Sequence, residues 1–246
     1  MLLVSAVVLT TVALQAAAGP VEIRAAVILP SDYRFSTSLP KVMSAVDIAV
    51  QHVYRAGILR QRDVVFKFVQ NDDKCEDIEA LRISFQMMFH NGGVDLFLGP
   101  TCDYGVDLVA RMIKSWNVPL LTAGGLTSDF SQDKQNPKSK YYLLVRTGTL
   151  AFQHIANMVA NVLDRYSWKK VLIIYEIDGY LKELGKQSCG LMVRTLVEKF
   201  KVDSIVQYDT FELSKNPQNS LVQNLRIEVS SKFTGKHVIF VDYWVG

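Results

Sequence analysis

The side chains best suited to chemistry in this 246-residue sequence are three cysteines, Cys75, Cys102 and Cys189. Cysteines form disulfides in an oxidising compartment, whereas in a reducing one they bind metals or act as nucleophiles. Cys75 lies in the acidic segment NDDKCED and Cys102 in FLGPTCDYG, each shortly after an apolar run. Three cysteines cannot all pair within one chain, so the compartment decides which chemistry applies.

Several function classes lack support in the sequence. The four histidines, His52, His90, His154 and His237, are far apart and do not show the spacing of metal ligands. No nucleotide-binding glycine motif and no GxSxG nucleophile elbow occurs, and NDDKCED lacks the spacing of a calcium loop, so we interpret it as a solvated acidic turn. The 27 basic and 24 acidic residues are scattered, which argues against a nucleic-acid partner. We expect no catalytic residue, no metal and no cofactor other than an anion considered below.

The N-terminal segment indicates an oxidising compartment. Residues 1–19 hold no charged side chain and end in small residues, which is typical of a secretory signal peptide. The alternative is an uncleaved membrane anchor, which needs roughly 20 apolar residues, and fewer precede Gln15. We expect the chain to enter the secretory pathway and to lie on the extracellular face of the plasma membrane, where any membrane span would follow Gly246.

The remaining sequence alternates between short β-branched runs and segments with helical periodicity, which predicts an α/β fold with parallel sheets. We predict a first lobe over 20–147 and part of a second over 148–246. The last strand has no helix after it, so we expect the second lobe to be incomplete at the C-terminus. The predicted strands are 22–29, 63–69, 94–98, 118–122, 142–146, 171–175, 202–211 and 237–242. The predicted helices are 41–55, 78–88, 103–116, 152–162, 186–200 and 220–230, with Ile78, Leu81, Phe85 and Met88 as the buried stripe of the second.

Cys75 and Cys102 each follow a predicted strand, 63–69 and 94–98. Parallel neighbouring strands end at the same edge of a sheet, so a disulfide between the two cysteines is geometrically plausible, with two free thiols as the alternative. The turn from Gly99 to Cys102 leads into a predicted helix N-terminus, where unpaired amides favour an anion; a plain strand-to-helix connection is the alternative. Asp103 suits the N-cap of that helix.

Four segments together resemble the ectodomains of natriuretic peptide receptors and other receptor-type guanylate cyclases. They are FLGPTCDYGVDLVARMIKSWNVPLLTAGG at 97–125, AAVILPSDYRFSTSLPKVMSAVDIAV at 25–50, RTGTLAFQ at 146–153 and WKKVLIIYE at 168–176. The Gly-Pro-x-Cys segment is the most specific of these. The resemblance implies a type I periplasmic-binding-protein fold with two Rossmann-like lobes.

The resemblance also implies roles for individual residues. It pairs Cys102 with Cys75 and places a chloride at the backbone amides of Thr101 and Cys102. Cys189 matches the first cysteine of a second family disulfide, and Asp242 stands where the partner cysteine is expected. The predicted sites therefore comprise one disulfide, a chloride at the turn and Cys189 outside that disulfide.

The function implied by the resemblance is the extracellular ligand-binding region of a receptor. Such a chain binds a secreted peptide, signals as a homodimer through helices of its first lobe, and has no catalytic activity itself. A full-length parent of the cyclase type would carry a cyclase domain, whereas one of the clearance type would not. The alternative is a receptor of the same fold that binds an amino-acid-like small molecule in the cleft between the lobes. The residues expected to line that cleft are Thr101, Ala123, Gly124, Thr127 and Ser128.

Overall fold

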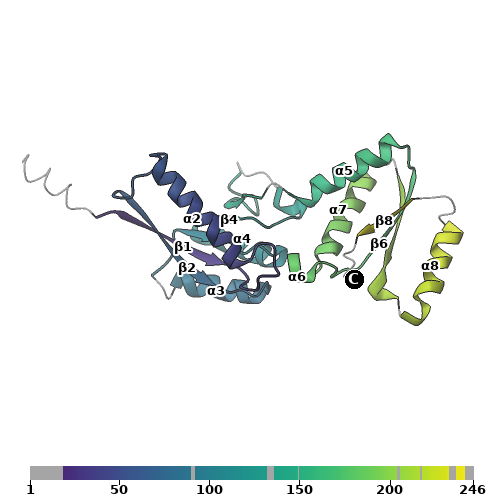
Figure 1. Ribbon diagram of the computed structural model, residues 1–246, viewed down its shortest axis with the longest axis horizontal. Helices are drawn as coiled ribbons and strands as arrows, with labels where there is room; N and C mark the ends of the chain where they lie inside the picture. Colours follow the sequence, from purple (N-terminus) through teal and green to yellow (C-terminus); the bar gives the residue numbers. More distant parts are fainter. Residues whose placement is uncertain are drawn as a thin grey trace, which may run out of the picture.

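The computed structural model describes residues 19–89, 92–131, 136–148, 150–203, 206–216, 218–232 and 237–241. They form two α/β lobes arranged end to end in an elongated molecule (Figure 1). The predicted signal peptide lies outside the described residues except for Gly19. Among the described residues no helix is long and apolar enough to cross a bilayer.

The first lobe contains a five-stranded parallel sheet in the order β2-β1-β3-β4-β5. β1 is buried at its C-terminal half, where residues 25–28 have no exposed surface, because helices cover both faces of the sheet there. The strands are β1 (Val21–Ile28), β2 (Val64–Asn71), β3 (Leu96–Leu98), β4 (Leu120–Thr122) and β5 (Leu144–Arg146).

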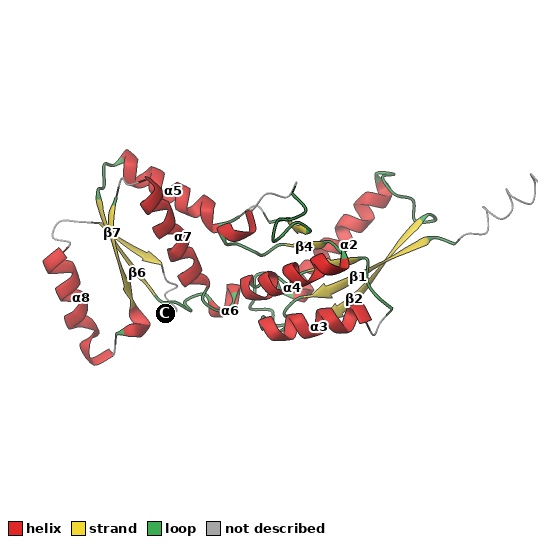
Figure 2. Cartoon of the chain, turned by 180° about the vertical axis from the view of Figure 1, so that it is seen from behind, coloured by secondary structure: helices red, strands yellow, loops and turns green. Residues whose placement is uncertain are grey.

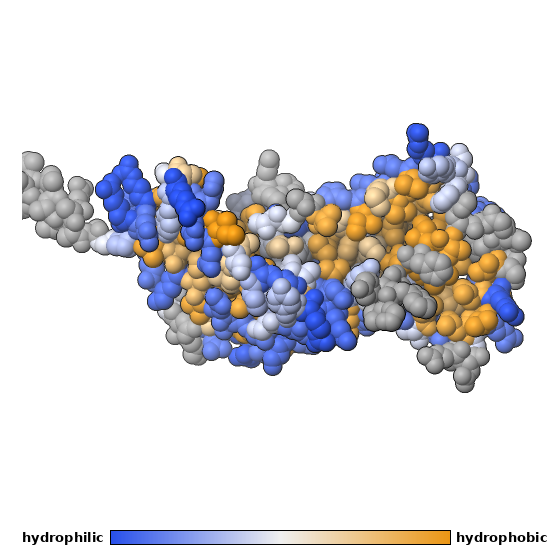
Figure 3. Space-filling view, viewed as in Figure 1, coloured by the Kyte–Doolittle hydropathy of each residue, from blue (hydrophilic) through white to orange (hydrophobic). Residues whose placement is uncertain are grey.

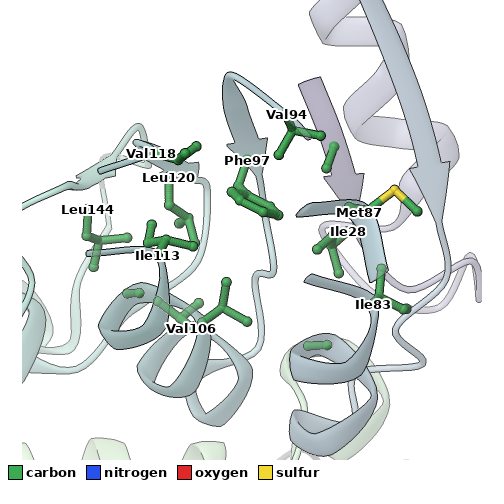
Figure 4. Close-up of a cluster of buried hydrophobic side chains, with 14 of the residues drawn as sticks. Ile28, Ile83, Met87, Val94, Phe97, Val106, Ile113, Val118, Leu120 and Leu144 are labelled. Carbon is green, nitrogen blue, oxygen red and sulfur yellow. The ribbon is translucent and has the colours of Figure 1, made fainter. Parts of the chain in front are cut away.

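The helices of the first lobe lie on opposite faces of this sheet. α3 (Asp77–Phe89) and α4 (Asp103–Trp116) pack on one face and bury the larger core, which includes Phe97 and Ile113 (Figure 4). α2 (Leu39–Arg55) lies on the other face, where Met43 contacts the smaller core. A short 3-10 helix, η1 (Ser128–Ser131), follows β4.

The predicted inward face of α3 is wrong at Ile78 and Phe85, although Met88 does pack against the core. Ile78 is 67% exposed and Phe85 45% exposed, whereas the buried positions of the helix are Ala80, Ile83, Ser84 and Met87. Apolar residues occur on two sides of this helix, so periodicity alone did not distinguish the side that meets the sheet. The consequence is an apolar surface on the outside of the first lobe.

The second lobe contains a three-stranded parallel sheet in the order β7-β6-β8. One core packs α5 and α7 on one face of β6, and a smaller one packs α8 on the other face (Figure 2). Apolar side chains also gather on the viewed surface of this lobe (Figure 3). The elements are α5 (Phe152–Arg165), β6 (Lys170–Tyr175), α6 (Leu181–Leu184), α7 (Ser188–Asp203), β7 (Gln207–Glu212), η2 (Leu213–Lys215), α8 (Gln218–Lys232) and β8 (His237–Val241).

The parallel-sheet α/β class predicted from the sequence is therefore confirmed. The short helix α6 was not predicted, because four residues carry too little periodicity to be recognised. Figure 1 and Figure 2 both place α6 beside α4, at the point where the two lobes meet.

Candidate functional site

The candidate site is built on the carboxyl ends of the first-lobe strands, where a disulfide joins Cys75 and Cys102 with their Cα atoms 5.6 Å apart. The strands that precede these cysteines, β2 and β3, were predicted to be neighbours, but β1 lies between them. The disulfide therefore crosses the end of β1, which continues into Leu29 and Pro30. The disulfide thus links the segments that follow β2 and β3 across the strand that lies between them.

Two aspartates shape the turn that carries Cys75. Asp72 Oδ1 accepts hydrogen bonds from the amides of Ser31 and Lys74, both at 2.9 Å, and Asp73 Oδ1 accepts one from the Cys75 amide at 3.1 Å. Asp73 is 1% exposed, so the prediction of a solvated acidic turn is wrong at this position. Burial, together with the neighbouring charge of Asp72, raises the pKa of Asp73 to about 6. Among the described residues, no group of three or more His, Cys, Asp or Glu side chains is arranged to hold a metal ion.

Close backbone contacts define the turn from Gly99 to Cys102. The Gly99–Pro100 peptide bond is cis, and the Thr122 hydroxyl donates to the carbonyl oxygen of Pro100 at 2.6 Å. A Cβ on Gly124 would lie 1.8 Å from the carbonyl oxygen of Thr101, so only glycine fits against this turn.

Asp103 does not act as the predicted N-cap. The N-cap of α4 is Cys102, and Asp103 is the first helical residue. Its Oδ1 accepts hydrogen bonds from the amides of Leu126, at 2.7 Å, and Thr127, at 3.2 Å, so this carboxyl group fixes the loop after β4. Burial raises the pKa of Asp103 to about 6, despite the amides and the nearby charge of Arg146, which favour the ionised form.

A segment of the second lobe docks on this edge of the first. The amide and hydroxyl of Ser36 donate to the carbonyl oxygen of Glu183 at 3.1 and 3.0 Å. Tyr104 donates its hydroxyl proton to Gln187 Oε1 at 2.6 Å. Lys186 Nζ lies 2.6 Å from Glu76 Oε2. These contacts come from the stretch that contains α6 and the start of α7.

Gly185 rests directly on the disulfide. A Cβ at this position would lie 2.5 Å from Cys75 Sγ and 3.2 Å from Cys102 Sγ. Its φ of 96° and ψ of −176° fall in a region that only glycine adopts readily. The disulfide is thus also the surface on which the second lobe packs, a role that the sequence did not indicate.

Behind these contacts, between the lobes, lies a cavity of about 570 Å³. We call it the interlobe pocket. Three of the predicted cleft residues, Thr101, Ala123 and Gly124, line it. The other two do not: Thr127 is buried beneath the loop, Ser128 begins η1, and Leu126 lines the pocket instead. The Asp103 carboxyl group fixes the backbone at both Leu126 and Thr127, and in the resulting loop the side chain of Leu126 rather than that of Thr127 lines the pocket.

Most of the residues that line the interlobe pocket were not predicted from the sequence. Ser36 and Thr37 follow the end of β1, and the position after a parallel strand was a usable signal for them. The second-lobe residues had no such signal, because α6 was not predicted and Cys189 was considered only for disulfide pairing. The residues missed are Ser36, Thr37, Leu126, Gly148, Leu150, Ala151, Phe152, Ile155, Tyr180, Leu184, Ser188, Cys189 and Met192.

The predicted chloride at Thr101 and Cys102 stays a prediction. The first turn of α4 offers amides to an anion, but the Asp103 carboxyl group lies in the same turn, and its ionised form would repel a second negative charge.

Residues 41–244 match the model of the family described as receptor family ligand binding region. The chain is similar to human atrial natriuretic peptide receptor 3, at 28% identity over 65% of this chain and 29% of that protein. It is also similar to rat atrial natriuretic peptide receptor 2, at 31% identity over 63% of this chain and 14% of that protein.

The fold is similar to a solved ABC transporter substrate-binding protein from Desulfitobacterium hafniense in complex with Leu. The TM-score is 0.64 at 17% identity, over 89% of this chain and 58% of that one. The chain therefore spans less than a third of these two receptors and somewhat more than half of the bacterial protein.

Proposed function

The chain belongs to the receptor family ligand binding region, and we propose that it is part of the extracellular region with which a receptor senses a secreted peptide. The observation that carries the proposal is the family match over residues 41–244, together with the similarity to two natriuretic peptide receptors. In this role the chain binds and does not catalyse. Any kinase-like or cyclase activity of a parent receptor would reside in other domains.

A peptide-binding experiment tests this proposal. The secreted chain, tagged at its C-terminus, is titrated with a panel of fluorescent secreted peptides that includes atrial natriuretic peptide. We expect saturable binding of at least one peptide, competed by its unlabelled form. Absence of saturable binding across the panel, with a chain that unfolds cooperatively, would contradict the proposal.

The surface of α3 supports the further proposal of a homodimer. Phe85 and Phe89 are 45% and 64% exposed, and both rings meet Trp116 edge-on, at centroid distances of 5.3 and 5.5 Å. Ile78, seven positions before Phe85, extends the same side of the helix. Exposed aromatic clusters of this kind are typical of protein interfaces. We therefore assign the dimer contact to this α3 patch, Ile78, Phe85, Phe89 and Trp116.

Sedimentation measures whether the α3 patch joins two chains. We expect the secreted chain to associate, and the double variant Phe85→Ser, Phe89→Ser to weaken the association at least tenfold, because both rings lose their burial in the interface. Tyr166→Ser, which removes an aromatic side chain that is 63% exposed on the second lobe, is the matched control and should associate normally. Equal association of all three proteins would place the contact elsewhere.

The interlobe pocket favours a second candidate function, the binding of an amino-acid-like small molecule between the lobes. The solved relative of the same fold was crystallised with Leu, and a cavity of about 570 Å³ accommodates a ligand of that size. A thermal-shift screen against the common amino acids tests this candidate, which a lack of stabilisation by any of them would remove.

A further inference from the structure

The second lobe covers the disulfide of the first. Cys75 and Cys102 are only 8% and 7% exposed. A Cβ on Gly185 would lie nearer to Cys75 Sγ than to any other atom, so the backbone of Gly185 covers this sulfur in particular. The hydrogen bond from the Tyr104 hydroxyl to Gln187 Oε1, at 2.6 Å, holds the cover in place. Access of a reagent to Cys75 Sγ therefore depends on movement of the segment around Gly185 away from the first lobe.

A cavity of about 230 Å³ lies beside this cover, and we call it the disulfide cavity. Cys75 and Gly185 both line it, whereas Cys102 is not among the described residues of its lining. The sulfur that Gly185 covers thus belongs to the cysteine that borders the cavity. Movement of Gly185 would open Cys75 Sγ to the disulfide cavity before Cys102 Sγ.

The lining of the disulfide cavity carries a net positive charge. Arg34 pairs with Asp32, and Lys186 Nζ lies 2.6 Å from Glu76 Oε2. Two further cations line the cavity, and neither forms an ion pair within the part of the chain that the structure describes; they are Lys74 and Lys182. Nearby cations attract an anionic molecule and stabilise the thiolate form of a thiol. The cavity therefore suits a small thiol that carries negative charge.

The surroundings of the two sulfurs differ in how well they stabilise a thiolate. Cys102 is the N-cap of α4, where unpaired amides and the helix dipole favour a negative charge, although the Asp103 carboxyl group opposes it. Lys186 lines a second cavity that both cysteines border, and its ammonium group adds a positive charge there. Cys75 instead lies in the acidic segment NDDKCED, whose four carboxyl groups disfavour a thiolate. The sulfur with the lower thiol pKa leaves faster in thiol–disulfide exchange, which favours departure of Cys102.

We propose that the Cys75–Cys102 disulfide is a modification site for a small anionic thiol of the glutathione class, and that the docking of Gly185 controls access to it. The secretory pathway holds thiols of this class. The thiolate sulfur of the small thiol forms a bond to Cys75 Sγ, and the bond between Cys75 Sγ and Cys102 Sγ breaks. Its electron pair goes to Cys102 Sγ, which leaves as a thiolate and takes a proton from water. One disulfide bond replaces another, so no further oxidant or reductant is needed.

The mixed disulfide keeps the lobes from docking again. Its substituent on Cys75 Sγ occupies the space that Gly185 fills, where a Cβ would already lie 2.5 Å from the sulfur. Attack of the Cys102 thiolate on the mixed disulfide expels the small thiol and restores the packing. The modification is therefore reversible, and it acts on the junction of the lobes whether or not a peptide binds to the chain.

Mass spectrometry of the secreted chain tests the site of modification. The chain is incubated with glutathione at neutral pH, quenched with N-ethylmaleimide and digested without a reductant. We expect glutathione on Cys75 and N-ethylmaleimide on Cys102. Retention of the intact disulfide, or glutathione mainly on Cys102, would overturn the proposal, and neither result would bear on peptide binding.

Variants test whether docking of the second lobe controls access. Gly185→Ala should speed the exchange with glutathione at least tenfold, because its methyl group cannot pack on the disulfide. Tyr104→Phe, which removes a contact across the junction and adds no atoms, should speed it at least twofold. Gly57→Ala is the matched control, since a Cβ there meets nothing within 4 Å, and should leave the rate unchanged. Equal rates in all four proteins, with their folds confirmed by circular dichroism, would refute control by docking.

The role of the basic lining is tested with two thiols of different charge, glutathione, which carries a net negative charge, and 2-mercaptoethanol, which is neutral. The double variant Lys74→Gln, Lys182→Gln should slow the exchange with glutathione at least twofold and leave that with 2-mercaptoethanol unchanged. The matched control is Lys138→Gln, Lys169→Gln, which removes two exposed lysines outside the lining and should change neither rate. Equal slowing of both thiols, or of neither, by the Lys74 and Lys182 changes would contradict selection of an anionic thiol.

Discussion

The two lobes bring different kinds of structure to their junction. On the first-lobe side, the strand ends are held by the Cys75–Cys102 disulfide, by glycine contacts such as Gly124 against Thr101, and by the buried carboxyl group of Asp103. On the second-lobe side, a four-residue helix and the start of α7 form the surface, and no disulfide is found among the described residues of that lobe. We therefore expect the first lobe to be the more rigid platform of the two.

The orientation of the two lobes depends on the contacts at their junction. Within the part of the chain that the structure describes, the direct hydrogen bonds across the junction are few, and a typical one contributes only about 0.5–1.5 kcal/mol net. The contact of Gly185 with the disulfide permits no side chain and therefore sets how closely the lobes approach. Changing either partner of this contact should therefore affect the two lobes unequally.

Removing the disulfide should have the largest effect. The Cys75→Ser, Cys102→Ser variant loses a cross-link between residues 27 positions apart, which stabilises by about 3–4 kcal/mol through restriction of the unfolded chain. Hydrogen exchange should show faster opening of β1, β2 and β3 and little change in β6 and β7. Equal loss of hydrogen-exchange protection in both lobes would show that the disulfide does not stabilise the first lobe selectively.

Gly185→Ala should have the second-largest effect. The new methyl group collides with the disulfide and the backbone leaves its preferred conformation, a cost of about 1–3 kcal/mol that separation of the lobes relieves. Cys189 is 1% exposed beside the interlobe pocket, so its reaction with a thiol reagent should become at least tenfold faster.

Gly57→Ala is the control for this variant. Gly57 also has a positive φ, of 68°, but a Cβ there would meet nothing within 4 Å. The control variant should leave the reactivity of Cys189 unchanged. A similar acceleration in both variants would attribute the effect to backbone strain rather than to the contact with the disulfide.

The smallest effect concerns pH. Asp73 and Asp103 have folded-state pKa values of about 6, above the 3.8 of the unfolded chain, so the folded lobe binds more protons between about pH 4 and 6. The stability contributed by these groups is present below about pH 4 and is lost as the pH rises through 6. Lowering the pH from 7 to 5 should stabilise the first lobe by on the order of 1 kcal/mol for each carboxyl group.

Urea unfolding at the two pH values measures this gain. The double variant Asp73→Asn, Asp103→Asn should remove the difference, because asparagine keeps an acceptor for the amides without titrating. A pH dependence unchanged in the double variant would assign the effect to other groups.

Much of the fold was predictable because its signals are local. Apolar periodicity predicted α4 at its observed bounds, Asp103–Trp116, and seven of the eight strands within two residues of their described bounds. The strand predicted to begin at Val202 was wrong at its start, because Val202 and Asp203 continue helix α7 and the strand begins at Gln207. The side of α3 that faces the sheet was predicted wrongly, since Phe85 and Met87 are both apolar and only packing distinguishes them. Of the five predicted cleft residues, the three nearest their strand ends, Thr101, Ala123 and Gly124, lie in the pocket.

The sequence by itself determined the α/β class, the two blocks of repeats, the family resemblance and the cysteines at strand ends, because each depends on residue types at short spacing. Only the tertiary structure decided the strand order that places β1 beneath the disulfide, the docking of Gly185 on that disulfide and the uncharged lining of the interlobe pocket. These features depend on pairs of residues more than 40 positions apart, such as Val21 and Val64 in the sheet, and contacts over such separations are selected by packing of the whole chain rather than by local preference.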